Sequence, residues 1–338
     1  RLRSMATGTW YHLKKSFALF PGRRTAVSAD VLQEHYAALM AERSALRMML
    51  DVILGTLFLL WIQPRARQTR KRYGLDHQWR LRAVRIARAR FLDPNEIALM
   101  GFDSEAAMAT VIRRFEFPAL SKAFNPAGWR SDCALADKRR FFERCREAGL
   151  PQPAMVATRI GGKLTVIEGP APSELIAKPV GGTGGHGIRV IRLGLDERCA
   201  SGLTGLLRRS LPGRGDWLVQ ERVRNHPSLT PLGMDALITV RITTMLNEHG
   251  DPEIVAALLR YPIRPGVYVD NTSHGGLMSA IDLTSGRLGA GIIGRSAGDL
   301  RIEHLQHPAT GRQILGFVLP HWRAVRHLVL RSHGDAFG

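Results

Sequence analysis

A glycine-rich loop preceded by a lysine is the segment whose residue types most clearly predict chemistry. It reads Lys178-Pro-Val-Gly-Gly-Thr-Gly-Gly-His-Gly187, with five glycines among its last seven residues. Because glycine has no Cβ, its backbone N–H groups can approach phosphate oxygens closely. Lys178 adds a compact positive charge beside them. The segment therefore predicts a phosphate-binding loop, and the alternative is a glycine-rich hairpin with an exposed lysine.

The residues around this loop separate three kinds of phosphate loop that share the G-x-G-x-x-G pattern of Gly182–Gly187. A dinucleotide-binding loop leads into a helix, whereas Ile188–Leu193 alternates apolar and charged residues like a strand. A Walker loop requires Lys and then Ser or Thr after its last glycine, where this chain has Ile188. A protein-kinase loop has its lysine downstream, whereas Lys178 comes first. A strand–loop–strand flap with a lysine on the incoming strand remains.

The elements that position this flap follow Asn125-Pro126, where alternating apolar and polar residues become frequent. Two runs flank Gly161-Gly162, which is a hairpin pattern. Further strands are expected over Glu174–Val180, Ile188–Leu193, Trp217–Val223, Leu237–Leu246 and Glu253–Ile263, and helices over Leu135–Ala148, Glu197–Ser210 and Trp322–Ser332. The fold class predicted from this order is α+β with mostly antiparallel sheets.

The first 120 residues are expected to be mostly helical, and the 338-residue length favours more than one domain. Residues 1–27 show no period and are expected to be poorly ordered. A helix, or two, is predicted from a cap at Ser28 to Ile62, with Pro64 ending it. Later helices are predicted over Asp76–Phe91, after a capping box at Asp93–Glu96, and over Ser104–Phe115. The predicted domains are a basic helical region, 28–120, and an α+β domain, 125–338.

The charge balance favours a polyanionic partner. Lys and Arg number 48 against 29 Asp and Glu, a formal net charge of +19. Between Pro64 and Leu92 there are ten basic residues and one acid, Asp76. A positive charge of this size favours binding of nucleic acid, anionic lipid, nucleotide phosphate or acidic sugar. The simpler explanation is a basic helix face that is exposed to solvent. Nucleic acid is the least favoured, because neither zinc-finger spacing nor a ribonucleoprotein-type aromatic motif is found.

An apolar run and three cysteines bear on location. Met48–Ile62 is 15 residues long and contains Asp51, whereas about 18 residues are needed to span a bilayer. It predicts a buried helix, and a membrane-associated helix flanked by arginines is the alternative. The cysteines show no Cys-x-x-Cys pair, which argues against a disulfide scaffold and a structural zinc site. No signal-peptide pattern is found. The expected location is the cytoplasm, with peripheral contact to the inner face of the membrane as an option.

Several further pieces follow one another in a defined order. Ala136-Asp-Lys138 opens an amphipathic helix, Leu218-Val-Gln-Glu-Arg-Val223 reads as a strand, Thr239-Val-Arg241 as another, and Arg260 precedes Val269-Asp-Asn-Thr-Ser-His-Gly-Gly276. With the flap, these pieces make the region from about Phe91 to Gly338 resemble the ATP-grasp ligases. The most similar group is associated with sugar transfer and polysaccharide loci and is related to the α-glutamate ligases.

The resemblance implies an ATP-grasp fold, in which two α+β subdomains clasp a nucleotide, and it assigns roles to individual residues. The nucleotide-binding residues it implies are Lys138, Lys178, the lid residues Gly182, Thr183, Gly184, Gly185, His186 and Gly187, and the hinge residues Gln220, Glu221 and Val223. Arg241 and Arg260 would contact the transferred phosphate, and Asn271 would orient the acceptor or a metal. Taken singly, Lys138 also fits a solvated helix lysine, Glu221 an edge-strand charge, the two arginines surface pairs with Glu248 or Glu253, and Asn271 a turn.

The activity implied is an ATP-dependent carboxylate–amine or carboxylate–hydroxyl ligase that works through an acyl phosphate, with ATP and Mg²⁺ as cofactors. Polysaccharide biosynthesis or peptide modification would be its setting, with a saccharide-linked acceptor as one option. The family's magnesium ligands come last, as an Asp and then Glu-x-Asn, and Asp282 and Glu303 do not match their positions. The metal ligands are therefore unknown, and the domain is expected to lack its C-terminal end. A nucleotide-binding but catalytically silent module, with a basic region that binds an anionic polymer or membrane surface, is the second hypothesis.

Overall fold

The structure is a computed structural model that describes residues 37, 41–104, 107, 121–122, 124–130, 133, 135, 137–167, 169, 171–181, 187–213, 215–268, 270, 276–293 and 302–337. The chain divides into two compact units, Arg1–Arg130 and Ser131–Gly338. The predicted cap at Ser28, the helix expected over Ser104–Phe115 and the expected disorder of residues 1–27 all lie outside the described residues, apart from Ser104 and Ala107.

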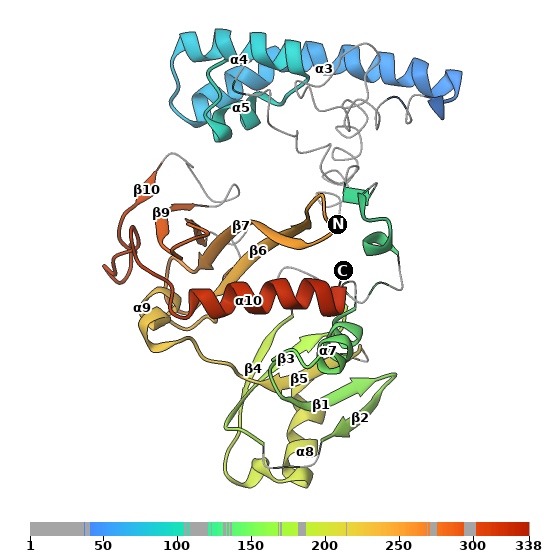
Figure 1. Cartoon of the computed structure of the whole chain (residues 1–338), viewed down its shortest axis with the longest axis vertical. Helices are drawn as coiled ribbons and strands as arrows, with labels where there is room; N and C mark the ends of the chain where they lie inside the picture. Colours follow the sequence, from blue (N-terminus) through green and yellow to red (C-terminus); the bar gives the residue numbers. More distant parts are fainter. Residues whose placement is uncertain are drawn as a thin grey trace. The chain divides into compact units, whose positions relative to one another are not determined.

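Among the described residues of the first unit, three helices share one small core (Figure 1). They are α3 (Ala45–Arg72), α4 (His77–Arg90) and α5 (Pro94–Met100). Asp76 caps α4, and Asp93 caps α5 with Pro94 at its first position, which confirms the predicted starts of both helices. Phe58 of α3 stacks on Phe91 with ring centroids 5.5 Å apart, so an aromatic pair closes the α3–α4 packing.

Two predictions about α3 are wrong. Pro64 does not end the helix, which continues to Arg72. The buried stripe of α3 continues through Ile62, Ala66 and Thr69 on both sides of the exposed Pro64, and packing along this stripe offsets the lost hydrogen bond. The apolar run is also not a buried helix, because only Asp51, Gly55, Phe58 and Ile62 within it are buried. By length and composition, α3 could cross a membrane, and 22% of its most apolar window is buried.

Replacing Pro64 by alanine is expected to stabilise the chain by about 1–3 kcal/mol, because it restores a helix N–H and removes a ring clash. Denaturant unfolding of the full chain measures this difference. The matched control is Gln63→Ala in the same helix, which should change the free energy of unfolding by less than about 0.5 kcal/mol. A destabilised Pro64→Ala variant would mean that the packing of α3 depends on the proline.

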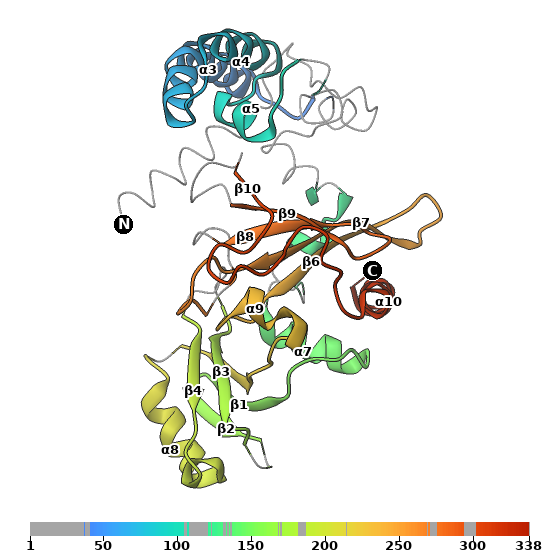
Figure 2. The same cartoon turned by 90° about the vertical axis from the view of Figure 1, so that its left-hand side faces the viewer.

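Two five-stranded antiparallel sheets form the frame of the second unit (Figures 1 and 2). The first sheet has the order β2-β1-β5-β3-β4, and the second has β10-β9-β8-β7-β6. The strands are β1 (Met155–Ile160), β2 (Lys163–Val166), β3 (Glu174–Pro179), β4 (Arg189–Arg192), β5 (Trp217–Glu221), β6 (Thr239–Leu246), β7 (Pro252–Tyr261), β8 (Leu277–Ile281), β9 (Leu288–Ile293) and β10 (Glu303–His304). This confirms the α+β class and the hairpin at Gly161-Gly162, while β8, β9 and β10 were not predicted.

Helices cover both sheets and complete their cores. The longer ones are α7 (Lys138–Glu147), α8 (Ala200–Ser210) and α10 (Trp322–Ser332), and the short ones are η4 (Asp196–Arg198), η5 (Pro227–Leu229), α9 (Thr230–Gly233) and η7 (His333–Phe337). A further short helix, η2 (Ala127–Trp129), belongs to the first unit. Leu203 and Leu207 of α8 pack into the core of the first sheet. Trp322 of α10 packs into the core of the second sheet, and its indole N–H donates to Leu283 O at 3.0 Å.

The segment between β5 and β6 carries the chain from the first sheet to the second. Asn225 fixes it, because its side-chain amide donates to Ala236 O at 2.7 Å and accepts from Ile238 N at 3.0 Å. Gly233 lies so close to Asn225 that a Cβ on it would be 2.2 Å from the amide nitrogen. A glycine is therefore required where this connection folds back on itself.

Candidate nucleotide-binding site

The glycine-rich loop joins two paired strands, as predicted. β3 and β4 are antiparallel neighbours with Ile176 opposite Val190, and Lys178 lies near the end of β3. Gly182, Thr183, Gly184, Gly185 and His186 lie outside the described residues. Gly187 has φ +79°, and a Cβ there would be 3.0 Å from the Pro179 ring. The strand after the loop excludes a dinucleotide-binding arrangement, which requires a helix there.

Two lysines, Lys138 and Lys178, come together at the start of this loop. Lys138 is the first residue of α7, and its Nζ donates to Val180 O at 3.0 Å. Burial lowers the pKa of Lys178, and the neighbouring charge of Lys138 lowers it further. No ion pair joins Lys178 to any residue of the described chain. Two ammonium groups that repel each other at the start of a glycine-rich loop favour the binding of an anion there.

A cavity of about 130 Å³ adjoins Lys178 and contains most of the predicted hinge. Lys178, Gln220, Glu221 and Val223 line it, together with Pro153, Ile176, Val190, Arg222, Asp235, Leu237 and Tyr268. The cavity is smaller than the roughly 300–1,000 Å³ of pockets that enclose a drug-sized ligand, so it suits one ring system better than a whole nucleotide. Its walls come from the first sheet, from the connection between the sheets, and from Tyr268 in the loop between β7 and β8.

The hinge strand is held by its own side chains. Gln220 is buried, and its Nε2 donates to Pro153 O at 3.2 Å. One carboxylate oxygen of Glu221 accepts from Ala154 N at 3.0 Å, and Glu221 N donates to Ala154 O at the same distance. These bonds fix the edge of the cavity against the start of β1. Glu221 is thus tied to the neighbouring backbone, and its assignment to adenine or ribose stays a prediction.

Arg222 forms one wall of the cavity, and sequence reasoning missed it. Its guanidinium pairs with Glu174 at 3.3 Å, donates to Asp235 O at 2.8 Å and lies 5.8 Å from the centre of the Tyr268 ring. Burial raises the pKa of Glu174, but the hydrogen bond from Arg192 and the charges of Arg222 and Arg224 outweigh it and hold the pKa below its usual value. Through these contacts, Arg222 links Glu174 on β3 to Asp235 and Tyr268.

Arg241 and Arg260 lie on one face of the β6–β7 pair. Thr239 is opposite Arg260 and Arg241 is two residues further along β6, so strand alternation places all three on the same side. Arg260 Nη2 donates to Thr239 Oγ1 at 3.0 Å and pairs with Asp270 at 3.3 Å, while the Thr239 hydroxyl also donates to Asp270. Arg260 therefore pairs with neither Glu248 nor Glu253. Arg241 is exposed.

Arg260 lies near the cavity, and its hydrogen bonding within the described residues is incomplete. Arg260 Nε is buried, and no hydrogen-bond partner for it exists among the described residues. Asp270 is two residues after Tyr268, so their Cα atoms are at most about 7 Å apart. A buried N–H without an acceptor is costly, and a ligand oxygen would satisfy it. Asn271 lies outside the described residues.

The acidic side chains that the structure describes are the candidates for holding magnesium. Within the described residues, no group of three or more His, Cys, Asp or Glu side chains is arranged to hold a metal ion. Asp282 accepts from Ser285 N at 2.7 Å and Ser285 Oγ at 2.6 Å, so it shapes the turn after β8. Glu303 lies on β10 opposite Ile292. Asp282 and Glu303 therefore do not fit a magnesium site.

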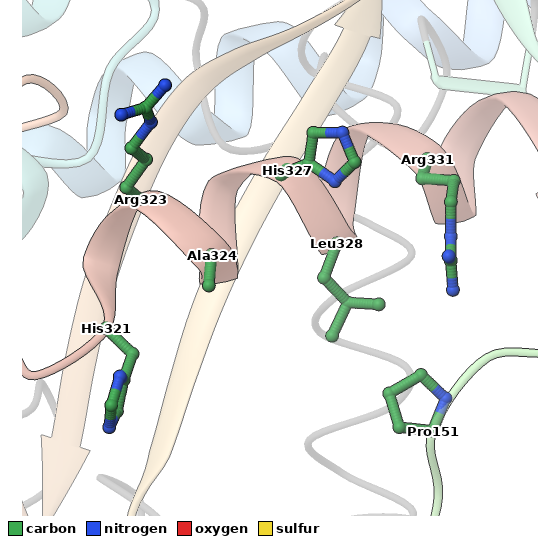
Figure 3. A pocket seen from close by; sticks show the side chains of 7 residues that line it. All are labelled: Pro151, His321, Arg323, Ala324, His327, Leu328 and Arg331. Carbon is green, nitrogen blue, oxygen red and sulfur yellow. The ribbon is translucent and has the colours of Figure 1, made fainter.

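A larger cavity, of about 610 Å³, lies along α10 (Figure 3). His321, Ala324, Leu328 and Arg331 face Pro151 there, and none of the predicted site residues lines it. Judged by volume alone, this cavity would be the better candidate for the nucleotide site. The smaller one is the better nucleotide candidate, because the two lysines, the flap strands and the hinge residues meet there.

Comparison with protein families agrees with this geometry. The sequence model of the family described as sugar-transfer associated ATP-grasp matches residues 121–336. The match covers well over half of the chain, and the chain belongs to this family. A search among curated proteins found no match. The resemblance inferred from the sequence is therefore confirmed. The ATP-grasp fold implies that the chain binds ATP.

Proposed function

We propose that the protein is an ATP-dependent ligase that joins a carboxylate to an amine or a hydroxyl through an acyl phosphate. One observation carries the proposal: Lys178 and the hinge residues Gln220, Glu221 and Val223 line a single cavity, with Lys138 beside it. Family membership supports nucleotide binding, and the chemistry proposed is that of the ligases this family resembles.

The two lysines are assigned to the phosphates. Lys138 and Lys178 would neutralise the α- and β-phosphate oxygens, and the base would occupy the cavity between Ile176, Val190 and Leu237. The backbone N–H groups of the glycine loop would close over the phosphates and keep water from the acyl phosphate. Tyr268 and Arg222 would form the opposite wall.

The two arginines are assigned to the group that is transferred. A carboxylate oxygen would attack the γ-phosphorus, the bond to the bridging β-phosphate oxygen would break, and ADP would leave. The amine or hydroxyl would then attack the acyl carbon, lose its proton and expel phosphate. Arg241 and Arg260 would stabilise the charge on the γ-phosphate oxygens during the first step, and Asn271 would orient the acceptor. Thr239 and Asp270 hold Arg260 for this role.

The test is to trap the acyl phosphate. The protein is incubated with ATP, a panel of sugar and amino-acid carboxylates, and hydroxylamine, which converts an acyl phosphate to a hydroxamate. Hydroxamate that forms only with ATP and one class of carboxylate supports the ligase and identifies the donor. ATP hydrolysis without hydroxamate across the panel would contradict it.

A catalytically silent nucleotide-binding module is the second candidate, and one observation favours it. Among the described residues, no carboxylate group fits magnesium, which normally bridges the phosphates in phosphoryl transfer. The two candidates differ in a single measurement, since a silent module would bind ATP and yield neither ADP nor hydroxamate. A polysaccharide-related setting remains a proposal that rests on the family resemblance, and a cytoplasmic location remains a proposal that rests on the sparse, scattered cysteines.

Nucleotide binding should take up a proton at Lys178. Burial and the charge of Lys138 lower its pKa in the free protein, so its proton is lost at a lower pH than that of an ordinary lysine. Bound phosphate favours the ammonium and raises the pKa again. Affinity should therefore fall as pH rises through the lowered pKa, with proton uptake in the window between the two values.

Calorimetric titration of ATP in two buffers of different ionisation enthalpy measures this uptake. Lys178→Arg serves as the control, because its guanidinium stays protonated and should abolish both the uptake and the pH dependence. Equal uptake in the parent chain and in this variant would assign the proton to another group.

A further inference from the structure

The outer face of α3 is apolar over its first four turns although it is exposed. This face consists of Leu46, Met49, Ile53, Leu57 and Leu60, whose exposed fractions are 64%, 55%, 47%, 55% and 69%. At 100° per residue these positions lie opposite the buried stripe of Asp51, Gly55, Phe58 and Ile62. Soluble proteins rarely expose a contiguous row of large apolar side chains, and such rows mark interaction surfaces.

The same face becomes basic further along the helix. Arg67 and Lys71 continue the outer face after Pro64, and both are exposed. Within the described residues, neither of these two cations forms an ion pair. The outer face therefore pairs an apolar row with positive charges that have no counter-ion among the described residues, the composition of helices that bind anionic lipid.

We propose that the outer face of α3 lies in the surface of an anionic membrane, with its apolar residues among the acyl chains and its basic end at the headgroups. The charges indicate that the partner is an anionic membrane. A second protein chain would not require the outer face to continue as a basic stretch without acids. By length the whole of α3 could cross a bilayer, but its exposed apolar row from Leu46 to Leu60 extends only about 21 Å, shorter than the roughly 30 Å hydrocarbon core. A row of this length along one side of a helix suits a helix that lies in the membrane surface.

The buried side of α3 fits the same orientation. Asp51 is fully buried on the inner stripe, where Arg43 and Arg47 pair with it. Phe58, Ile62 and Ala66 pack against α4 and α5. A spanning orientation would bring the Asp51 group into hydrocarbon, which is costly. Lying in the interface leaves the charged and packed side of α3 on the protein and exposes only the outer face to lipid.

Vesicle flotation of the full chain tests the proposal. The chain should float with vesicles of phosphatidylcholine and phosphatidylglycerol, remain unbound with phosphatidylcholine alone, and be released by alkaline carbonate. Ile53→Gln with Leu57→Gln should lower the partition coefficient at least tenfold. Arg67→Glu with Lys71→Glu should do so by a similar factor. These residues are exposed, so the thermal unfolding of both variants should match that of the parent.

Matched controls change the same residue types elsewhere. Leu195→Gln with Met245→Gln, and Arg208→Glu with Arg323→Glu, alter exposed side chains of the second unit and should change partitioning less than about twofold. No flotation, equal effects of test and control variants, or equal binding to neutral vesicles would overturn the proposal. Resistance to alkaline carbonate would replace it with a spanning helix. Dissociation of a dimer by the α3 changes, with flotation unchanged, would assign the face to a second copy. None of these outcomes depends on nucleotide binding.

Discussion

Replacing Lys178 by methionine is expected to weaken ATP binding by roughly ten- to a hundredfold, because a charge-assisted hydrogen bond to phosphate contributes about 1.5–3 kcal/mol. The Lys178 ammonium lies beside Lys138 and lines the cavity, without an ion-pair partner in the described chain. Methionine is unbranched and only one atom shorter than lysine, so it keeps most of the packing of the side chain and the fold should be retained. Calorimetric titration with ATP measures the change, and thermal unfolding checks the fold.

Lys163→Met is the matched control. Lys163 is exposed on β2, opposite Ile160, and belongs to the same sheet. Its replacement removes the same charge and should leave ATP affinity within about twofold, because an exposed charge at a distance is screened. If both variants lose affinity equally, net charge rather than the local lysine pair governs binding, and the assignment of Lys178 fails.

The second large effect is expected at Arg260, on the rate of acyl-phosphate formation. Loss of one preorganised group that stabilises transition-state charge typically lowers kcat by about 10²–10³-fold. Arg260→Leu should therefore reduce hydroxamate formation by that factor and change ATP affinity little. Asp270→Asn should have a smaller effect, about tenfold, because Arg260 keeps Thr239 as a partner but loses its charged one.

Arg208→Leu is the control for both changes. Arg208 is exposed on α8, away from β6 and β7 in sequence, and its loss should leave the rate unchanged. If Arg260→Leu weakens ATP binding as much as Lys178→Met, then Arg260 binds the ground state rather than the transferred group. A rate equal to that of the parent would remove Arg260 from the site.

The strands on either side of the glycine loop could be predicted because their information is local. The alternation of Ile188–Leu193 predicts a strand after the glycine loop, and β4 is that strand. The shared site of Lys138, Lys178 and Glu221 came instead from the family resemblance; Lys178 and Glu221 line the cavity, and the charge of Lys138 lowers the pKa of Lys178. Local periodicity and residue type determine such features before tertiary packing is known.

The residues that sequence reasoning missed are brought to the site by tertiary structure. Arg222 belongs to the predicted hinge segment and Asp270 to the predicted acceptor loop. The sequence around each of them does not indicate which residue it contacts. Glu174, which pairs with Arg222, is 48 residues away. Asp235 lies in the connection between the sheets, and Tyr268 lies in the loop between β7 and β8. Only cross-strand pairing and the folded connection reveal these contacts.

The errors on α3 have a related cause. A proline inside a helical pattern usually marks its end, but the stripe on either side of Pro64 packs against α4 and α5, and this packing overrides the local preference. The buried-helix prediction rests on length, because the 15 residues of the apolar run are fewer than the roughly 18 that span a bilayer. Neither length nor composition distinguishes a face that packs on protein from one that is exposed.

Photolabelling with 2-azido-ATP tests most directly whether the cavity beside Lys178 is the nucleotide site. The full chain is irradiated with the probe, digested and analysed by mass spectrometry, with unmodified ATP as competitor. The label should appear on peptides that contain the cavity residues Ile176, Val190, Gln220, Val223, Leu237 or Tyr268, and excess ATP should prevent it. Label on the basic region between Pro64 and Leu92, or on α10 beside Pro151, that ATP prevents would contradict the assignment.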